Sequence, residues 1–194
     1  MPAQSRHRQA IVQAAQALFR RRGYAATGLN DIVERSRAPK GSLYHYFPRG
    51  KVEIGEAAVR GAGELVRRTL DQIAAETPTA AALQREYARR LAGWMAQSGW
   101  RDGCPITTIL LETAADHAAL RQAGAEAFAG WAAVTARKLE ADGVDPAQAA
   151  ALASFAVSAL EGGLIQARVQ QSAAPLLQAG ETVARLCEQA ASRR

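Results

Sequence analysis

The sequence is short of several residue types and patterns, and each shortage narrows what the protein can be. Its 194 residues include two cysteines, Cys104 and Cys187, with no CxxC spacing, which excludes a disulfide framework and fits a reducing compartment such as the cytoplasm. No run of eighteen or more apolar residues is present, so we expect no membrane-spanning helix. Residues 1–9 have no apolar stretch behind their basic side chains, so we expect no secretory signal.

Histidine is also scarce, and the few that occur do not form a catalytic arrangement. His7, His45 and His117 are scattered, and no convincing Cys/His or Ser/His/Asp set accompanies them. Glu112, Asp116 and His117 lie at i, i+4 and i+5, a spacing that could hold a metal or serve an enzyme. Carboxylates at helical spacing are more often solvated or capping, so we expect no catalytic residue, metal or cofactor, and an enzyme using these three residues remains a rival hypothesis.

What the chain has in abundance is alanine and apolar residues at helical spacing, broken by Gly and Pro. This pattern predicts an all-α protein of about nine helices. We expect helices over residues 6–22, 29–36, 39–47, 51–76, 80–97, 105–115, 118–141, 146–171 and 175–191, with Thr79 as a cap for the fifth.

Positive charge is concentrated in the first third of the chain. Residues 1–60 contain eleven Lys and Arg against four Asp and Glu, which leaves +7, whereas the whole chain has a net charge of +6. One module is therefore expected to meet a polyanion. A basic soluble surface is the alternative, and no amphipathic helix rich in Lys or Arg and aromatics supports an anionic membrane instead. Two of the three lysines, Lys40 and Lys51, flank one short predicted helix, as expected for phosphate contacts.

Residues 27–33 and 38–47 predict two short helices joined by a tight turn. In the second helix, Leu43 and Phe47 are expected to face the protein core, which leaves polar and aromatic side chains exposed on its surface. This is the anatomy of a helix-turn-helix, whose second helix enters the DNA major groove. Gly41 lowers helix propensity by about 1 kcal/mol but lets the backbone approach DNA. The candidate DNA-binding residues are Thr27, Gly28, Lys40, Gly41, Ser42, Tyr44, His45, Tyr46 and Lys51.

The same blocks, Asp31-Ile32-Val33 and 40–47, resemble the N-terminal module of the TetR family of bacterial repressors. The loop 48–51 and the triplet Gly103-Cys104-Pro105 are similar to its LmrA/YxaF-like branch. Gly28 stands where this family usually has a capping Ser or Thr, a role that Thr27 is expected to take. The resemblance implies a three-helix DNA-binding domain over 1–50. It also implies a larger helical effector-binding and dimerisation domain over 51–194, with 51–76 as connector.

Aromatic residues gather in the C-terminal two thirds of the chain, which predicts an apolar effector cavity with a few polar groups such as Gln97, Thr107 or Glu112. A plain hydrophobic core is the alternative. The candidate ligand-binding residues are Trp94, Trp100, Cys104, Thr107, Phe128, Trp131 and Phe155.

The pair Gly162-Gly163 in a predicted helix indicates close helix packing, within one subunit or across a dimer. The resemblance implies a homodimer through the last two helices. We therefore expect a cytoplasmic, ligand-responsive regulator, most simply a repressor released from a palindromic DNA operator by a small apolar or aromatic effector. The alternative is a redox-sensing regulator that uses Cys104 at a helix N-terminus, although the sequence favours a buried inert cysteine at this position.

Overall fold

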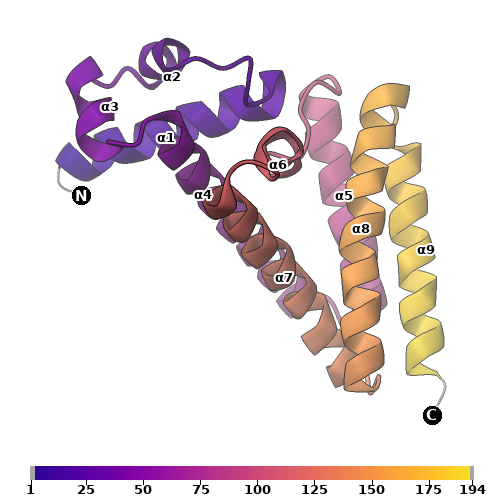
Figure 1. The fold of residues 1–194 in the computed structure, drawn as a ribbon. Coiled ribbons are helices and arrows are strands. Elements are labelled where there is room, and N and C mark those ends of the chain that lie inside the picture. The colour runs from indigo at the N-terminus through magenta and orange to yellow at the C-terminus, as the bar shows by residue number, and fades with distance from the viewer. Residues whose placement is uncertain (1–2, 193–194) are drawn as a thin grey trace. The chain divides into compact units, whose positions relative to one another are not determined.

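Every regular element in the described part of the chain is an α-helix, as the sequence predicts. The computed structural model describes residues 3–192, with side chains from Arg6 onward, and within that range it has nine helices and no strand (Figure 1). They are α1 (Ala3–Arg22), α2 (Leu29–Ser36), α3 (Lys40–Tyr46), α4 (Lys51–Glu76), α5 (Ala80–Gln97), α6 (Thr107–Thr113), α7 (Ala118–Ala141), α8 (Pro146–Gln170) and α9 (Ala174–Ala191).

Glycine, proline and capping residues set many of the helix ends. Gly23 ends α1 with a φ of 87°, a left-handed conformation that glycine adopts without strain. The Thr79 hydroxyl accepts a hydrogen bond from Ala82 N at 3.2 Å, which confirms the predicted cap of α5. Asp145 caps α8 in the same way, since its carboxylate accepts from Ala147 N at 3.0 Å.

Two predicted helices are longer than the observed ones. Pro39 has a ψ of 136°, which is not helical, so α3 begins at Lys40 instead. The helix expected over 105–115 is Thr107–Thr113. Its C-terminal end tightens because Asp116 N donates to Thr113 O at 3.2 Å, a three-residue turn that does not continue an α-helix.

Contacts within the chain divide it into two compact units. The division between them does not fall at residue 50, where the sequence predicts the domain boundary. The first unit contains residues up to Glu64 together with Cys104–Ala127. The second contains Leu65–Gly103 and Phe128–Arg194. The division falls within the continuous helices α4 and α7, so α6 and the start of α7 belong with α1, α2 and α3.

The first unit is built around α1, against which α2, α3 and α6 pack (Figure 1). Apolar residues at helical spacing form its inner face, and Ile11, Ala15 and Phe19 are fully buried. Ile32 of α2 and Leu43 of α3 are fully buried as well. Burial of these large side chains, each worth about 1.5–3 kcal/mol, fixes the two short helices that isolated peptides of that length would not hold.

The second unit contains α5, α8 and α9, which lie side by side (Figure 1). Ala80, Ala149 and Val183 belong to one buried cluster shared by these helices. Arg85 of α5 reaches two carboxylates of α9, Glu181 and Glu188, each at 2.7 Å. Many of the contacts are made by alanine, so the helices approach closely with little side-chain volume between them.

Helix α8 is more apolar than expected, because the sequence predicts no helix of membrane-spanning character. Its most apolar 18-residue window has a mean hydropathy of 1.4, which meets length and composition criteria for a span, and 33% of that window is buried. Ser154, Ser158 and Glu161 break the apolar run without lowering the average much. A helix that packs between other helices passes the same test, and α8 buries Ala149 and Ala156 beside α9.

Candidate DNA interface and effector cavity

Helix α3 is anchored by its apolar side, which leaves its other side exposed. Leu43 and the adjoining Phe47 are fully buried, and the Arg8 guanidinium of α1 lies 5.3 Å from the Phe47 ring centre. The predicted core residues of this segment are therefore confirmed. The remaining candidate contacts of α3 are exposed or half-buried, namely Lys40, Gly41, Ser42, Tyr44, His45 and Tyr46.

The exposed side of α3 combines an open backbone with aromatic groups. Apart from its chain neighbours and the nearby backbone of α3, no described atom lies within 4 Å of where a Cβ on Gly41 would be, so the first turn can be approached closely. Tyr44 is 55% exposed, and the His45 and Tyr46 rings meet edge to face at 4.9 Å. Exposed aromatics and hydrogen-bonding groups on one short helix match what direct reading of base edges requires.

The start of α2 is capped differently from the sequence expectation. Thr27 is fully buried, and its hydroxyl donates to Gly23 O at 2.9 Å, so it does not cap the helix. Gly28 is the N-cap residue, and its N–H donates to Asp31 Oδ2 at 2.7 Å. Asp31 thus supplies the second half of a capping box by accepting from the N–H of Gly28, and its negative charge near the helix start also suits the helix dipole.

Lys51, the first residue of α4, is partly engaged inside the first unit. Its ammonium donates to Ala25 O at 3.3 Å and lies 4.3 Å from the centre of the Tyr24 ring. Burial lowers the pKa of Lys51, while the charge of Glu112 acts in the opposite direction. A phosphate at this position would therefore compete with contacts that the lysine already makes.

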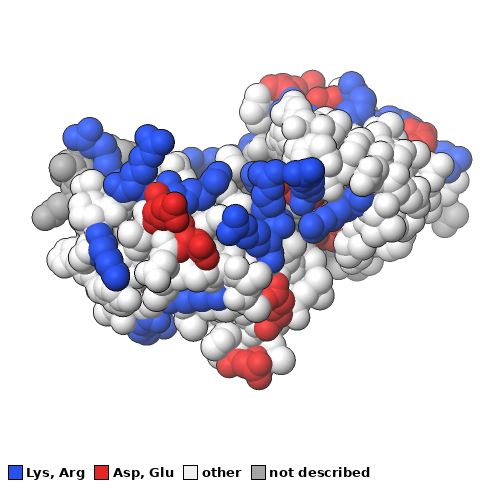
Figure 2. Space-filling model, turned by 90° about the horizontal axis from the view of Figure 1, so that it is seen from above, with Lys and Arg blue, Asp and Glu red and all other residues white. Residues whose placement is uncertain are grey.

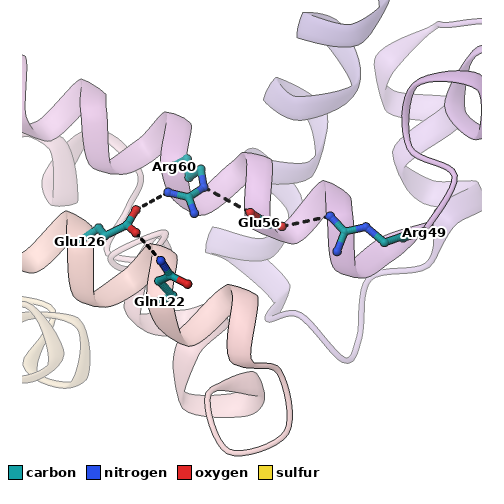
Figure 3. Close-up of polar contacts among 5 residues, drawn as sticks. All are labelled: Arg49, Glu56, Arg60, Gln122 and Glu126. Carbon is teal, nitrogen blue, oxygen red and sulfur yellow. Dashed lines mark hydrogen bonds and ion pairs between the residues drawn. The ribbon is translucent and has the colours of Figure 1, made fainter.

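Basic side chains spread over much of the surface in Figure 2, with acidic ones in a few spots. Some basic residues of the first unit are already paired. Arg49 lies 3.3 Å from Glu56, which is also 3.3 Å from Arg60, and Arg60 pairs with Glu126 of α7 (Figure 3). Gln122 donates to Glu126 at 2.9 Å. Arg49, Arg60 and Glu126 are largely exposed and Glu56 is partly buried, so water weakens each pair, but together the pairs connect α4 to α7.

The second unit contains a small cavity with a polar group that lacks a partner. It encloses about 20 Å³, room for about one water molecule. Gln84 is 1% exposed, and its Nε2 donates to Thr135 Oγ1 at 3.0 Å, whereas Oε1 has no hydrogen-bond partner among the described atoms. The wall consists of Leu70, Gln84, Tyr87, Leu91, Trp131, Thr135, Ala156, Val157, Leu160 and Glu161.

Of the candidate ligand-binding residues, the structure places Trp131 on this wall and Phe128 edge to face with it at 5.2 Å. Trp94 and Phe155 are 45% and 48% exposed, and Trp100 is half-buried in the loop after α5. Cys104 and Thr107 belong to the first unit. Sequence reasoning missed Gln84, although its spacing from Tyr87 and Leu91 puts all three on one helical face.

Glu112 and Asp116, which the sequence offered as part of a metal or enzyme site, do not form one in the described structure. No group of three or more His, Cys, Asp or Glu side chains suited to a metal occurs within the described range. Both carboxylate oxygens of Glu112 accept backbone hydrogen bonds from the turn between α1 and α2, and Asp116 is exposed. Glu112 therefore lies in the first unit rather than in the cavity where the sequence suggested it as a polar group.

The two cysteines have different environments. Cys187 is 2% exposed in the core beside α5, and burial raises its pKa to about 11, so it is a poor nucleophile near neutral pH. Cys104 is half-buried in the loop before α6, and its carbonyl accepts from the Thr108 hydroxyl at 2.9 Å.

Apolar side chains form an exposed stripe on α8, and Leu177 of α9 is also exposed. Phe155, Ile165 and Val169 are 48%, 54% and 79% exposed. Gly162 lies between them at helical spacing, and no described atom is within 4 Å of a Cβ built there. Gly163, by contrast, faces α9. We define the apolar stripe as Ala151, Phe155, Gly162, Ile165 and Val169.

Comparison with known proteins identifies both parts of the chain. The family of bacterial regulatory proteins called tetR matches residues 11–58, and the C-terminal domain of LmrA/YxaF-like transcriptional regulators matches residues 79–182. The chain is 35% identical to the transcriptional regulator YxaF of Bacillus subtilis strain 168 over 176 residues, which covers 91% of this chain and 92% of YxaF. Identity to LmrA of the same organism is 33% over 171 residues, covering 88% and 90%.

Solved structures agree with this assignment. The regulatory protein TetR from Rhodobacter sphaeroides superposes with a TM-score of 0.79 at 29% identity, covering 91% of this chain and 96% of that one. A TetR regulator from Chloroflexus aurantiacus gives 0.77 at 25% identity, covering 97% and 98%. The resemblance predicted from the helix-turn-helix residues is confirmed. The chain belongs to the TetR family of helix-turn-helix transcriptional regulators, with an LmrA/YxaF-like C-terminal domain, and it is a regulator rather than an enzyme.

Proposed function

We propose that the protein is a cytoplasmic, homodimeric repressor that binds a palindromic operator through α3 and is released by a small apolar or aromatic effector. The observation that carries this proposal is the exposed side of α3. Leu43 and Phe47 are buried and hold the helix against the core, while Lys40, Tyr44 and His45 are exposed. Lys40 and Tyr44 are the proposed contacts to base edges or thymine methyl groups, and Lys51 is a proposed phosphate contact.

A selection from random DNA tests the operator proposal. We expect the protein to enrich a short pseudo-palindrome whose half-site centres lie about 34–36 Å apart. A dimer that neutralises about six to ten phosphates should give a slope of log K against log salt of roughly −5 to −9. No enriched motif, or an affinity that salt does not change, would contradict the proposal.

The proposed dimer uses the apolar stripe of α8 together with α9. Phe155, Ile165, Val169 and Leu177 are apolar and between 41% and 79% exposed in the single chain. Several large apolar side chains exposed at helical spacing on one helix are unfavourable in water and typical of a subunit interface. The glycine at 162 would let a helix of the second copy approach closely. A second copy also supplies the second α3 that a palindrome requires.

The effector is proposed to enter the cavity at Gln84. A space of about 20 Å³ does not admit a ring, so binding requires the surrounding helices to separate. An effector of this kind selects a wider conformation, and it can release DNA only if that conformation binds the operator less well. The unpartnered Gln84 oxygen lacks a hydrogen-bond donor, so the proposed effector is an apolar or aromatic molecule that carries one hydroxyl or N–H group.

A pair of probes that differ by one donor tests the effector proposal. We expect para-cresol to release the operator at a concentration roughly 5- to 150-fold lower than its methyl ether needs. The reason is that the ether has no hydroxyl to donate and leaves Gln84 Oε1 unsatisfied. Operator release is measured by the anisotropy of a labelled duplex, and binding by tryptophan emission. In Gln84→Leu the two probes should become equivalent. Equal potency of the probes on the wild-type protein would mean that water satisfies the oxygen.

Oxidation of Cys104 is the competing mode of regulation, and a single variant separates the two. Because Cys187 is buried with a raised pKa, Cys104 is the thiol available to an oxidant. Effector release should persist unchanged in Cys104→Ser. The redox mode would be supported instead if peroxide released the wild-type protein but not Cys104→Ser from the operator, and if para-cresol released neither protein.

A further inference from the structure

A carboxylate on α6 binds the turn between α1 and α2. Glu112 Oε1 accepts from Tyr24 N at 2.9 Å, and Oε2 accepts from Ala25 N at 2.6 Å. Both bonds join residues almost ninety positions apart in the sequence and lie within the first unit. Hydrogen bonds to an ionised acceptor are stronger than neutral ones. We refer to Glu112 with the turn residues Gly23, Tyr24 and Ala25 as the turn clasp.

Glycine at position 23 makes this close approach possible. Its φ is 87°, which other residues rarely adopt. A Cβ at this position would overlap Oε1 of Glu112. Gly23 also closes α1 through its N–H, which donates to Phe19 O at 2.9 Å. The end of α1 and the binding of Glu112 therefore depend on the same residue.

Lys51 contacts the same turn from the start of α4. Its ammonium donates to Ala25 O and lies over the Tyr24 ring, while the charge of Glu112 acts on its pKa. The buried Thr27 hydroxyl adds a bond to Gly23 O. The turn is thus held by α6 and by α4 immediately before α2 begins.

We infer that Glu112 is a positioning residue for operator recognition, which holds α2 and α3 in the orientation that matches the major groove. It does not touch DNA; it fixes the turn from which α2 starts. A displacement of α6 would loosen the clasp and with it the placement of α3. This inference rests on the proposed operator binding and adds to it a residue outside the helix-turn-helix.

Replacing Glu112 tests the inference, because loss of its charge and loss of the turn clasp should change DNA affinity in opposite directions. Glu112→Gln removes a negative charge, which by electrostatics alone should raise affinity for any DNA. Loss of the clasp should instead lower affinity for the selected operator, by about 10-fold, while affinity for a scrambled duplex stays equal or rises. The control is Asp116→Asn, which removes the same charge from an exposed residue nearby. Anisotropy titrations of both duplexes give the ratio of specific to non-specific affinity.

Hydrogen exchange supplies an independent measurement that does not depend on DNA. Glu112→Gln should lose amide protection at Tyr24 and Ala25 while α1 and α5 keep theirs. Unchanged protection there, or variants at 112 and 116 that shift both duplexes equally, would overturn the inference. If the wild-type protein selects no DNA motif at all, the operator proposal fails first. A wild-type protein that binds its operator, with an unaffected Glu112→Gln, overturns the clasp alone.

Discussion

Replacing Gly162 by leucine is expected to convert the proposed dimer into monomers and to lower operator affinity at least about 100-fold. Gly162 lies on the apolar stripe with open space around an added Cβ, so we expect a leucine to be accommodated within a single chain. In a dimer the same side chain would separate the two α8 helices. Leucine also favours helix over glycine by up to about 1 kcal/mol, so the subunit should remain helical. Sedimentation and circular dichroism measure the two outcomes.

The neighbouring glycine provides the matched control. A Cβ on Gly163 would lie 3.4 Å from Ala179 Cβ and Leu176 of α9. Gly163→Leu should therefore overpack the subunit itself, costing about 1–3 kcal/mol of stability, and lower the melting temperature. Gly162→Leu should not. If Gly162→Leu sediments as a dimer at tens of micromolar, or if the wild type is already a monomer, the interface proposed on α8 is wrong.

Replacing Tyr44 by alanine is expected to reduce operator affinity strongly and to relax sequence preference at one position in each half-site. The aromatic side chain of Tyr44 in α3 is 55% exposed. Loss of one base contact costs about 1–3 kcal/mol, and a dimer loses two, which gives roughly 30- to 20,000-fold in affinity. Stability should change little because the ring packs against little of the protein. A selection repeated with the variant measures the preference.

Tyr44→Phe separates the ring from its hydroxyl. If the ring packs on a thymine methyl group, Tyr44→Phe should bind like the wild type, whereas a hydrogen bond from the hydroxyl would make it resemble Tyr44→Ala. A Tyr44→Ala protein with unchanged affinity and unchanged motif would remove Tyr44 from the interface. The salt slope should be the same in all three proteins, since no charge changes.

Helix positions were largely predictable because local chemistry determines them. Thr77-Pro78-Thr79 and the Asp142–Pro146 turn mark the ends of α4, α5, α7 and α8. The inner side of α3 was also predictable, since Leu43 and Phe47 are its large apolar residues. These features depend on residues within a few positions of one another, and sequence alone contains that information.

The cavity wall was not predictable from the same sequence. On α5 the side chains of Trp94 and Met95 point about 100° apart, and Met95 is 3% exposed while Trp94 is 45% exposed. An alanine-rich helix offers little polar contrast to show which of two adjacent residues faces inward. Gln84 faces inward although its type favours the surface. The sequence marked Glu112 as a candidate polar group, but its hydrogen-bond partners lie in the turn between α1 and α2. Only tertiary contacts bring that turn near α6.

The discontinuous first unit has a consequence for building chimeric regulators. A recombinant protein joined at residue 50 would take α1, α2 and α3 from one parent and α6 from the other. Glu112 and the start of α7 would then face a foreign turn and a foreign loop, although in this chain they belong to the same unit as α3. Transplanting the operator preference of this protein onto another sensor therefore requires two exchanged segments, residues up to Glu64 and Cys104–Ala127. A single crossover would supply the recognition helix without part of the unit that supports it.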